Sequence, residues 1–295
     1  MITNDDIRPL IFGEVLFDHF PDGSNILGGA PFNVAWHLQA FGHSPLFISR
    51  VGNDKPGEEI RSAMQAWGMD LFGLQSDPVH ATGSVEVSFS EGGPRYEIVQ
   101  QRAYDFIDEA ELPVIAGNTL LYHGSLALRH DISAKALAEI HRRTAAPRFV
   151  DINLRSPWWE MKSVQQMLGK ARWIKLNEEE LRLIVPGAIG DKQLLSGLLT
   201  DQTEFVALTK GAEGTSIISD NGVYDVRPQP TLTLVDTVGA GDAFCSVLLA
   251  GIIRQWPLSL TIERAQQFAS AIVGIRGATS RDRSFYECFI DAWKD

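Results

Sequence analysis

Short apolar runs alternate with amphipathic stretches along most of the chain. Runs rich in Val, Ile, Leu and Phe predict buried strands at residues 10–13, 46–51, 119–123, 148–152, 173–176 and 205–209. Between these runs, apolar residues recur at helical spacing over residues 31–41, 58–67, 132–143 and 178–185. Regular alternation of strand and helix favours a parallel sheet with helices on both faces. The sequence therefore predicts an α/β fold.

Two stretches break this alternation and predict antiparallel β-structure. Residues 84–90 alternate strictly between polar and apolar side chains, and a Gly-Gly-Pro turn leads into a second run at 95–101, so a hairpin is expected. A further short strand is predicted at residues 15–18. We expect these strands, drawn from about residues 14–28 and 80–106, to form a small sheet that projects from the main one.

The last third of the chain has a helical period, over residues 240–254, 258–274 and 284–293. No internal repeat, linker or low-complexity tract divides the sequence. A length of 295 residues fits one large domain or two ordinary ones. We therefore expect a single domain over residues 1–295, with the small sheet as an appendage.

Composition and charge disfavour several classes of protein. Hydrophobic residues make up 44% and charged residues 21% of the chain, as in ordinary globular proteins. The net charge of −11 has the wrong sign for a nucleic-acid or anionic-membrane partner. The longest apolar stretch is shorter than the roughly 20 residues that span a bilayer, and the acidic N-terminus is unlike a signal peptide. Cys245 and Cys288 lack a CxxC partner, which favours free thiols and a cytoplasmic location.

The strongest chemical signal is the run Val-Asp-Thr-Val-Gly-Ala-Gly-Asp-Ala-Phe at residues 235–244. The free N–H groups of a helix's first turn form an anion site, and glycines at 239 and 241 let a phosphate approach the backbone. Asp242 falls in that turn, within reach of a hydroxyl attacking a phosphoryl group bound there. The alternative interpretation is that Asp242 only complements the helix dipole and the glycines only form a tight turn.

Two common phosphate motifs are absent from the sequence. Phe244 stands where the dinucleotide-binding fingerprint needs Gly or Ala, and the first strand is followed by Gly-Glu-Val-Leu-Phe-Asp at residues 13–18. Gly169-Lys170 is followed by Ala171, so no P-loop is present. An NAD-dependent dehydrogenase and a P-loop ATPase are therefore disfavoured.

A second glycine loop precedes the helix predicted at residues 31–41. Gly28 and Gly29 allow a ligand to touch the backbone, and Pro31 favours a helix start. We expect Asn33 to point its amide at this loop, although a capping role for Asn33 is equally compatible with the sequence.

Polar residues also follow three of the predicted strands. Arg155 comes after the strand at residues 148–152, at the edge where parallel sheets bind ligands, and is a candidate anion clamp. Asn177 and Glu180 are candidates to hold a hydrated Mg²⁺, or else form a solvated helix start. Residues 209–214 predict a strand followed by a turn with two glycines, where a nucleotide could lie.

Taken together, these motifs resemble those of the PfkB/ribokinase family of carbohydrate kinases. Residues 236–244 resemble the family's C-terminal signature and residues 28–35 its N-terminal one, in the same order along the chain. The resemblance implies a ribokinase-like three-layer α/β/α core with a mainly parallel sheet and a small β-sheet lid. It also implies phosphorylation of a sugar hydroxyl with ATP and Mg²⁺.

The resemblance assigns roles to individual residues. It makes Asp242 the catalytic base and places Arg155 near the substrate and the transferring phosphoryl group. The anion hole is formed by the N–H groups of Gly239, Ala240 and Gly241. Sugar hydroxyls are held by Asp18, Gly28, Gly29, Asn33, Arg102 and Asn153. The Mg²⁺ and the nucleotide are bound by Asn177, Glu180, Thr209, Gly211, Gly214 and Ala278. A monovalent cation such as K⁺ is bound by Asp236 and the carbonyl of Val238.

Within the family, the sequence resembles bacterial fructokinases most. Residues 13–18, the Arg-Ala-Tyr-Asp stretch at 102–105 and the Asp-Ile-Asn-Leu-Arg stretch at 151–155 carry this resemblance. Kinases for 2-keto-3-deoxygluconate share the first and third of these elements and remain an alternative. A catalytically silent sugar or nucleotide sensor on the same fold is the alternative from another class. The exposed strands of the small sheet motivate a homodimer formed through that sheet.

Overall fold

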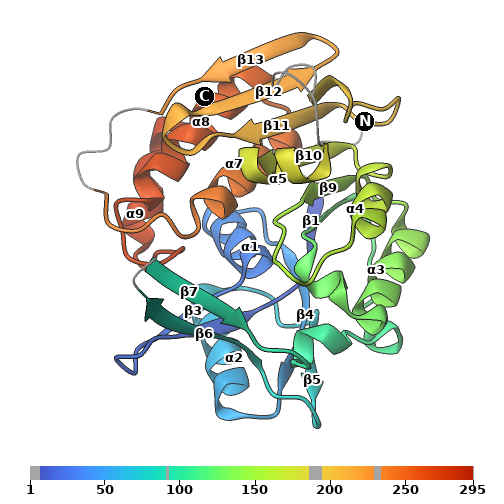
Figure 1. The fold of residues 1–295 in the computed structure, drawn as a ribbon, viewed down its shortest axis with the longest axis vertical. Helices are drawn as coiled ribbons and strands as arrows, with labels where there is room; N and C mark the ends of the chain where they lie inside the picture. Colours follow the sequence, from blue (N-terminus) through green and yellow to red (C-terminus); the bar gives the residue numbers. More distant parts are fainter. Residues whose placement is uncertain (1–6, 91–92, 186–194, 229–233, 295) are drawn as a thin grey trace.

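The computed structural model, which describes residues 7–90, 93–185, 195–228 and 234–294, is built around a nine-stranded sheet (Figure 1). Its strands are β1 (Arg8–Phe12), β4 (Leu46–Gly52), β5 (Leu74–Asp77), β8 (Thr119–His123), β9 (Arg148–Asp151), β10 (Trp173–Asn177), β11 (Phe205–Thr209), β12 (Thr215–Ser219) and β13 (Gly222–Val226). The spatial order is β13-β12-β11-β10-β9-β8-β1-β4-β5. The seven strands from β11 to β5 are parallel to one another, whereas β12 runs antiparallel to both its neighbours.

Helices cover both faces of this sheet. One face carries α1 (Ala30–Ala40), α2 (Lys55–Trp67), α7 (Ala240–Arg254), α8 (Leu258–Ile272) and α9 (Arg283–Ala292), whose buried side chains share one hydrophobic cluster. The other face carries α3 (Asp131–Thr144), α4 (Met161–Leu168) and α5 (Glu178–Ile184), which pack over two further clusters. The molecule is therefore a three-layer α/β/α structure, as the strand and helix pattern predicts.

A second, four-stranded sheet stands apart from the first, at the lower left of Figure 1. It has the order β3-β2-β6-β7 and consists of β2 (Leu16–His19), β3 (Asn25–Gly28), β6 (Gly83–Ser90) and β7 (Gly93–Ile98). The predicted hairpin is present as β6 and β7, although β7 begins and ends earlier than the run at 95–101 suggests. Residues 91–92 of the predicted turn lie outside the described residues.

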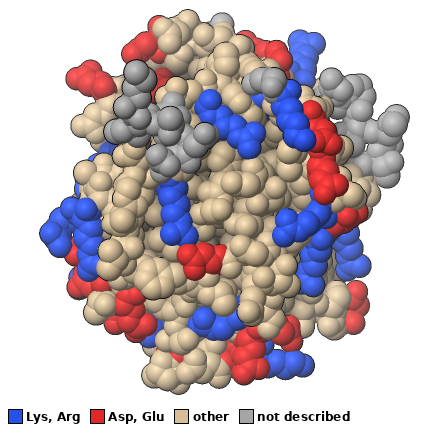
Figure 2. Space-filling view, turned by 180° about the vertical axis from the view of Figure 1, so that it is seen from behind, with Lys and Arg blue, Asp and Glu red and all other residues tan. Residues whose placement is uncertain are grey.

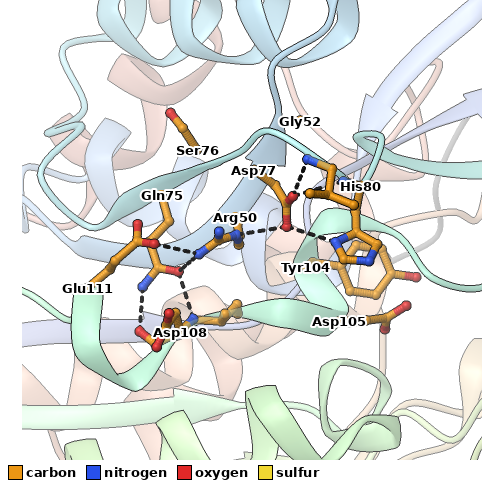
Figure 3. Close-up of polar contacts among 12 residues, drawn as sticks. Arg50, Gly52, Gln75, Ser76, Asp77, His80, Tyr104, Asp105, Asp108 and Glu111 are labelled. Carbon is orange, nitrogen blue, oxygen red and sulfur yellow. Dashed lines mark hydrogen bonds and ion pairs between the residues drawn. The ribbon is translucent and has the colours of Figure 1, made fainter.

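Two aspartates hold the chain where it enters β6. Asp77, at the end of β5, accepts hydrogen bonds from the backbone N–H groups of Val79 and His80 and pairs with Arg50 of β4 at 2.9 Å. Figure 3 shows Arg50 lying between Asp77 and Gln75. Because Asp77 binds both strand β4 and the loop that leads to β6, it holds this loop against the main sheet. We call the loop, residues 78–82, the foot of the second sheet.

The second anchor is Asp54, which caps α2. Its carboxylate accepts the N–H of Gly57 at 2.9 Å and the N–H of Thr82 at 2.8 Å. The Thr82 hydroxyl also binds this carboxylate and accepts the N–H of Gly52 at 3.0 Å. Capping of α2 and attachment of β6 therefore depend on one side chain.

The surface carries charge of both signs. Figure 2 shows Lys and Arg side chains interspersed with Asp and Glu around the back face of the described part of the molecule. Within the described residues, none of the helices combines the length and the apolarity that a membrane span requires.

We predict that Asp77→Asn lowers the free energy of unfolding at pH 7 by about 2 kcal/mol, because it removes the charged partner of Arg50 in β5 and leaves only the half-exposed Glu111 paired with that guanidinium, at 3.0 Å. Burial alone would raise the pKa of Asp77, but hydrogen bonds from His80 and Val79 and the Arg50 charge lower it to about 2. The ionised carboxylate therefore stabilises the fold above its ordinary pKa, and this contribution is lost as the pH falls through about 2.

Urea unfolding followed by circular dichroism at pH 7 measures the effect. The control is Asp291→Asn, which removes an ion pair to Lys294 whose side chains are 68% and 70% exposed, and should cost less than about 1 kcal/mol. Equal losses in the two variants would contradict the anchoring role of Asp77.

Candidate active site

Asp242 lies in the first turn of α7, at the end of the sheet where the parallel strands terminate. Its Oδ2 accepts a hydrogen bond of 2.8 Å from Nδ2 of Asn33, in the first turn of α1. The expectation that Asn33 turns its amide toward its own loop is therefore wrong. Asn33 binds Asp242 because α1 and α7 pack side by side, a long-range arrangement that local sequence does not show.

Two glycines in the backbone before Asp242 make room for close neighbours. Gly239 is the N-cap residue of α7 with φ +81, and a Cβ there would lie 2.3 Å from Cβ of Ala278. A Cβ on Gly241 would lie 3.0 Å from Nζ of Lys175. Because the first-turn amides of a helix have no partners within it, the turn at 239–241 presents N–H groups and a positive dipole end to a bound anion.

Ala278 borders this turn from the other side. Its carbonyl lies 3.1 Å from Nε2 of His37, whose Nδ1 lies 3.0 Å from the Tyr286 hydroxyl. Burial lowers the pKa of His37 to about 3, so the imidazole is neutral at physiological pH. His37 therefore supports the segment that packs on Gly239.

Three carboxyl groups with raised pKa values face the same region. Burial raises the pKa of Asp242 to about 6, that of Asp18 on β2 to about 6, and that of Glu14 after β1 to about 7. The Arg155 charge lowers the pKa of all three, which places its guanidinium among them. Residues from β1, β2, α7 and the loop after β9 thus converge at one place.

The glycines before α1 fit closely around these groups. A Cβ on Gly28 would lie 3.8 Å from Oδ2 of Asp18, so Gly28 borders the Asp18 carboxyl. Gly29 has φ +108, and a Cβ there would lie 2.7 Å from the carbonyl oxygen of Glu14. Gly29 therefore allows the start of α1 to approach the end of β1.

Two predicted substrate-binding residues have other described partners. The charge of Arg102 lowers the pKa of Asp54, and its backbone N–H donates to Asp105, which places Arg102 at the foot of the second sheet. Asn153 has φ +40, and its carbonyl accepts a hydrogen bond from Ser125. The described contacts link neither side chain to Asp242.

The predicted nucleotide residues lie along neighbouring strand ends. Asn177 and Thr209 are register partners at the ends of β10 and β11. Asn177 and Glu180 form a capping box for α5, and Oε1 of Glu180 accepts the N–H of Leu154. Both carboxylate oxygens of Glu180 are thus hydrogen-bonded to backbone N–H groups, so direct contact with a metal ion would compete with these bonds.

The turn after β11 is formed with two glycines at positive φ, +54 at Gly211 and +100 at Gly214. A Cβ on Gly214 would lie 2.1 Å from the carbonyl oxygen of Val226, so β13 packs directly against this turn. Asp236 connects two loops near α7, because it accepts N–H groups from Val238 and Gly277 at 3.0 and 3.1 Å.

Sequence analysis assigned no role to Glu14 or Lys175, and both contribute to the site. Oε2 of Glu14 is buried and has no hydrogen-bond partner among the described residues. Lys175 is buried and pairs with Asp151 at 3.1 Å. The only sequence signal for either residue was the position of Lys175 within the otherwise apolar run Trp-Ile-Lys-Leu at 173–176.

A cavity of about 480 Å³ lies elsewhere, between α3 and α4. Its lining includes His123, Arg148, Trp158 and Trp159 but not Asp242. The carboxylate and the glycine turn, rather than the size of a cavity, therefore identify the candidate active site.

A buried carboxylate beside an open helix N-terminus, at the strand ends of a three-layer α/β/α fold, defines a phosphotransferase that acts on a hydroxyl group. The chain belongs to the pfkB family of carbohydrate kinases, whose model matches residues 6–283.

Individual relatives agree with this assignment. The chain is 30% identical to the fructokinase of Escherichia coli over 288 residues, 91% of this chain and 94% of the relative. A crystal structure of fructokinase from Vibrio cholerae O395, in a form with fructose, ADP and calcium ion bound, has a TM-score of 0.81 and 25% identity over 96% of this chain and 99% of that one. An uncharacterized sugar kinase from Pyrococcus horikoshii in complex with ATP has a TM-score of 0.77 and 25% identity over 92% and 93% of the two chains.

We predict that kcat falls on the acid side with an apparent pKa of about 6, because Asp242 must be ionised to accept a proton. The hydrogen bond from Asn33 stabilises the carboxylate and lowers its pKa. Asn33→Leu should therefore move the half-maximal kcat to higher pH, as measured by ADP release from pH 5 to 8. An unmoved acid limb in a folded Asn33→Leu variant would show that another group titrates.

Proposed function

We propose that the chain is a fructokinase that transfers the γ-phosphoryl group of MgATP to a hydroxyl of fructose. The observation that carries this proposal is the Asp242 carboxylate, held by Asn33 beside the glycine turn at 239–241. A base and an anion site that share one helix turn suit the attack of a hydroxyl on a bound phosphoryl group.

The mechanism follows from these positions. Asp242 accepts the proton of the sugar hydroxyl as its oxygen attacks phosphorus, and the O–P bond to the leaving ADP breaks in line. The amides of Gly239, Ala240 and Gly241 and the guanidinium of Arg155 stabilise the charge on the transferring group. The protein supplies position and electrostatic stabilisation rather than a covalent intermediate.

Two arguments favour fructose over 2-keto-3-deoxygluconate. Several of the relatives are named fructokinase, including the one from Escherichia coli. The sugar side of the proposed site contains Asp18, whose pKa of about 6 leaves it mostly ionised at pH 7 and able to repel the carboxylate of an acidic sugar. Glu14, with a pKa of about 7, is partly protonated, and both carboxyl groups can form hydrogen bonds with the hydroxyls of a neutral sugar.

We propose one kinase domain in which the four-stranded sheet is a lid over the sugar. Asp18, Val85 and Tyr96 lie on the same face of that sheet by strand register, and the Asp18 and Asp236 charges raise the pKa of Tyr96. This face is therefore directed toward the site. A lid in that position excludes water and limits ATP hydrolysis.

The nucleotide is proposed to lie along Asn177, Thr209 and the turn with Gly211 and Gly214, with Ala278 beside the adenine. Mg²⁺ arrives with ATP, and Asn177 at the end of β10 and Glu180 in the first turn of α5 support it. For K⁺, Asp236 and the Val238 carbonyl are the proposed ligands, and Asp236 would share its two oxygens between the cation and the N–H groups of Val238 and Gly277. Supply of ATP and two unpaired cysteines fit a cytoplasmic enzyme.

We predict that Asp242→Asn lowers fructose-dependent ADP release by about 10²-fold or more, the scale of a lost general base. Asn keeps the size of the side chain but cannot accept the proton. The measurement is a coupled assay for ADP with fructose, 2-keto-3-deoxygluconate, ribose and glucose, alongside titration of MgATP binding.

Each outcome of this assay separates the alternatives. The proposal is supported if the wild type turns over fructose and Asp242→Asn loses this turnover but still binds MgATP. Turnover on another sugar keeps the mechanism and rejects the substrate. A wild-type protein that binds ATP but phosphorylates none of the sugars would instead favour a sensor.

We also propose a homodimer formed through the lids. Phe89, on strand β6 of the lid, is 67% exposed, an apolar side chain that a second copy could bury. We predict a dimer by light scattering at micromolar concentration and a monomer for Phe89→Asp. A monomeric wild-type protein would refute this assembly.

A further inference from the structure

Lys175 forms a buried ion pair beneath the glycine turn of α7. Its Nζ lies 3.1 Å from Oδ1 of Asp151 on the neighbouring strand β9, and the two side chains are only 7% and 1% exposed. A buried charge pair of this kind contributes little net stability, because the cost of desolvating both ions offsets their attraction. Stability alone therefore does not account for a lysine at this position.

The partners of Asp151 leave the ammonium directed at the turn. Oδ2 of Asp151 accepts hydrogen bonds from the Tyr122 hydroxyl at 3.3 Å and the Cys245 thiol at 3.4 Å, while Oδ1 accepts from Lys175. Within the described residues, Asp151 is the one hydrogen-bond partner that the structure records for Lys175. The other N–H bonds of the ammonium lie in the space next to Gly241.

The contact with Gly241 fixes this position. A Cβ at residue 241 would lie 3.0 Å from Nζ and 3.8 Å from Cε of Lys175, so the glycine makes room for the lysine. The ammonium therefore lies against Gly241, a residue of the turn whose amides the proposed mechanism uses as an anion hole.

The charge is also permanent. Burial disfavours the charged form, but Asp151, Cys245 and Glu180 together hold the pKa of Lys175 above its ordinary value. Asp151 raises the pKa of Asp242 and Lys175 lowers it, so both charges of the pair reach the base. A fixed cation in a low-dielectric site acts on developing charge without reorganisation.

We propose that Lys175 is a positioning residue for phosphoryl transfer, whose ammonium, held by Asp151 beneath Gly241, strengthens the binding of the γ-phosphoryl group at the N-terminus of α7. This inference rests on the proposed function. Lys175 acts through the backbone amides of the turn and through the electric field of its ammonium group. Asp151 sets the direction in which this ammonium group points.

The test removes both charges together, with Lys175→Met/Asp151→Asn. A purely structural pair should be replaceable by neutral side chains without kinetic loss. We expect an unfolding midpoint close to that of wild type, a kcat lowered about 10²-fold, as for loss of one anion-hole donor, and an unchanged KM for fructose. Affinity for a non-hydrolysable ATP analogue should fall by more than affinity for MgADP, because only the former carries a γ-phosphoryl group.

The matched control is Arg172→Met/Glu204→Gln, which removes an ion pair just before β10 whose side chains are 53% and 52% exposed. It should leave kcat and both nucleotide affinities unchanged. If Lys175→Met/Asp151→Asn does not fold, Lys175→Gln keeps a donor to Asp151 and is expected to show the same kinetic loss.

A folded variant of either kind with wild-type kcat and analogue affinity would overturn the inference. Failure of the proposed function is distinguishable, because it appears as absent turnover in the wild type. The difference between ATP-analogue and ADP affinities decides the role of Lys175 without any sugar being phosphorylated.

Discussion

The structure depends on how closely other elements approach the N-terminus of α7. Ala278 lies against Gly239 on one side, the Lys175 ammonium against Gly241 on another, and Asn33 binds Asp242 at 2.8 Å. Gly239 and Gly241 carry no side chain where Ala278 and Lys175 approach, and Ala240 between them carries only a methyl group, which leaves room for a ligand to reach the backbone N–H groups. The same contacts fix the orientation of the Asp242 carboxylate, so the proposed base and the proposed anion site depend on the same packing around the N-terminus of α7.

Charge is distributed unequally across the site. Glu14, Asp18 and Asp242 lie on the proposed sugar side of the site, and burial raises the pKa of each. Lys175 and Arg155 bring positive charge to the neighbourhood of Asp242 and oppose this rise. Carboxyl groups accept hydrogen bonds from sugar hydroxyls, whereas cations and amides stabilise phosphoryl oxygens. In the proposed mechanism the sugar hydroxyl and the phosphoryl group therefore meet at Asp242. This position requires a carboxyl group that is neither strongly acidic nor fully neutral.

Local sequence patterns predicted six strands of the main sheet, namely β1, β4, β8, β9, β10 and β11, because each of these is a short apolar run. The edge strand β5, Leu-Gln-Ser-Asp, lacks such a run and was not predicted, and neither was helix α4. The pair β12 and β13 was not predicted, since its signal is a weak alternation around a turn at residues 220–221. Helix α8 ends at Ile272, two residues before the predicted end at Gly274. These differences concern edges and ends, where tertiary contacts decide the outcome.

The site was predictable where its chemistry lies in a contiguous motif, as in residues 239–242, and not where it depends on packing. The partner of Asn33 is 209 positions away in the chain. Lys175 gains its place only because β9 and β10 are neighbours and α7 crosses above them. Charged residues in apolar strands are thus the sequence signal that merited more weight, because their burial requires a partner.

The foot of the second sheet shows that residues remote from the chemistry still determine it. Asp18 belongs to the second sheet, whereas Asp242 belongs to a helix on the main one. Their relative position therefore depends on what joins the two sheets. Asp77 and Asp54 make that joint. Asp77 holds residues 79–80 against β4 and β5 (Figure 3), and Asp54, which caps α2, holds Thr82. Because β6 continues from this joint and pairs with β2 through Asp18 and Val85, the anchoring carboxylates define where a sugar hydroxyl can meet the base.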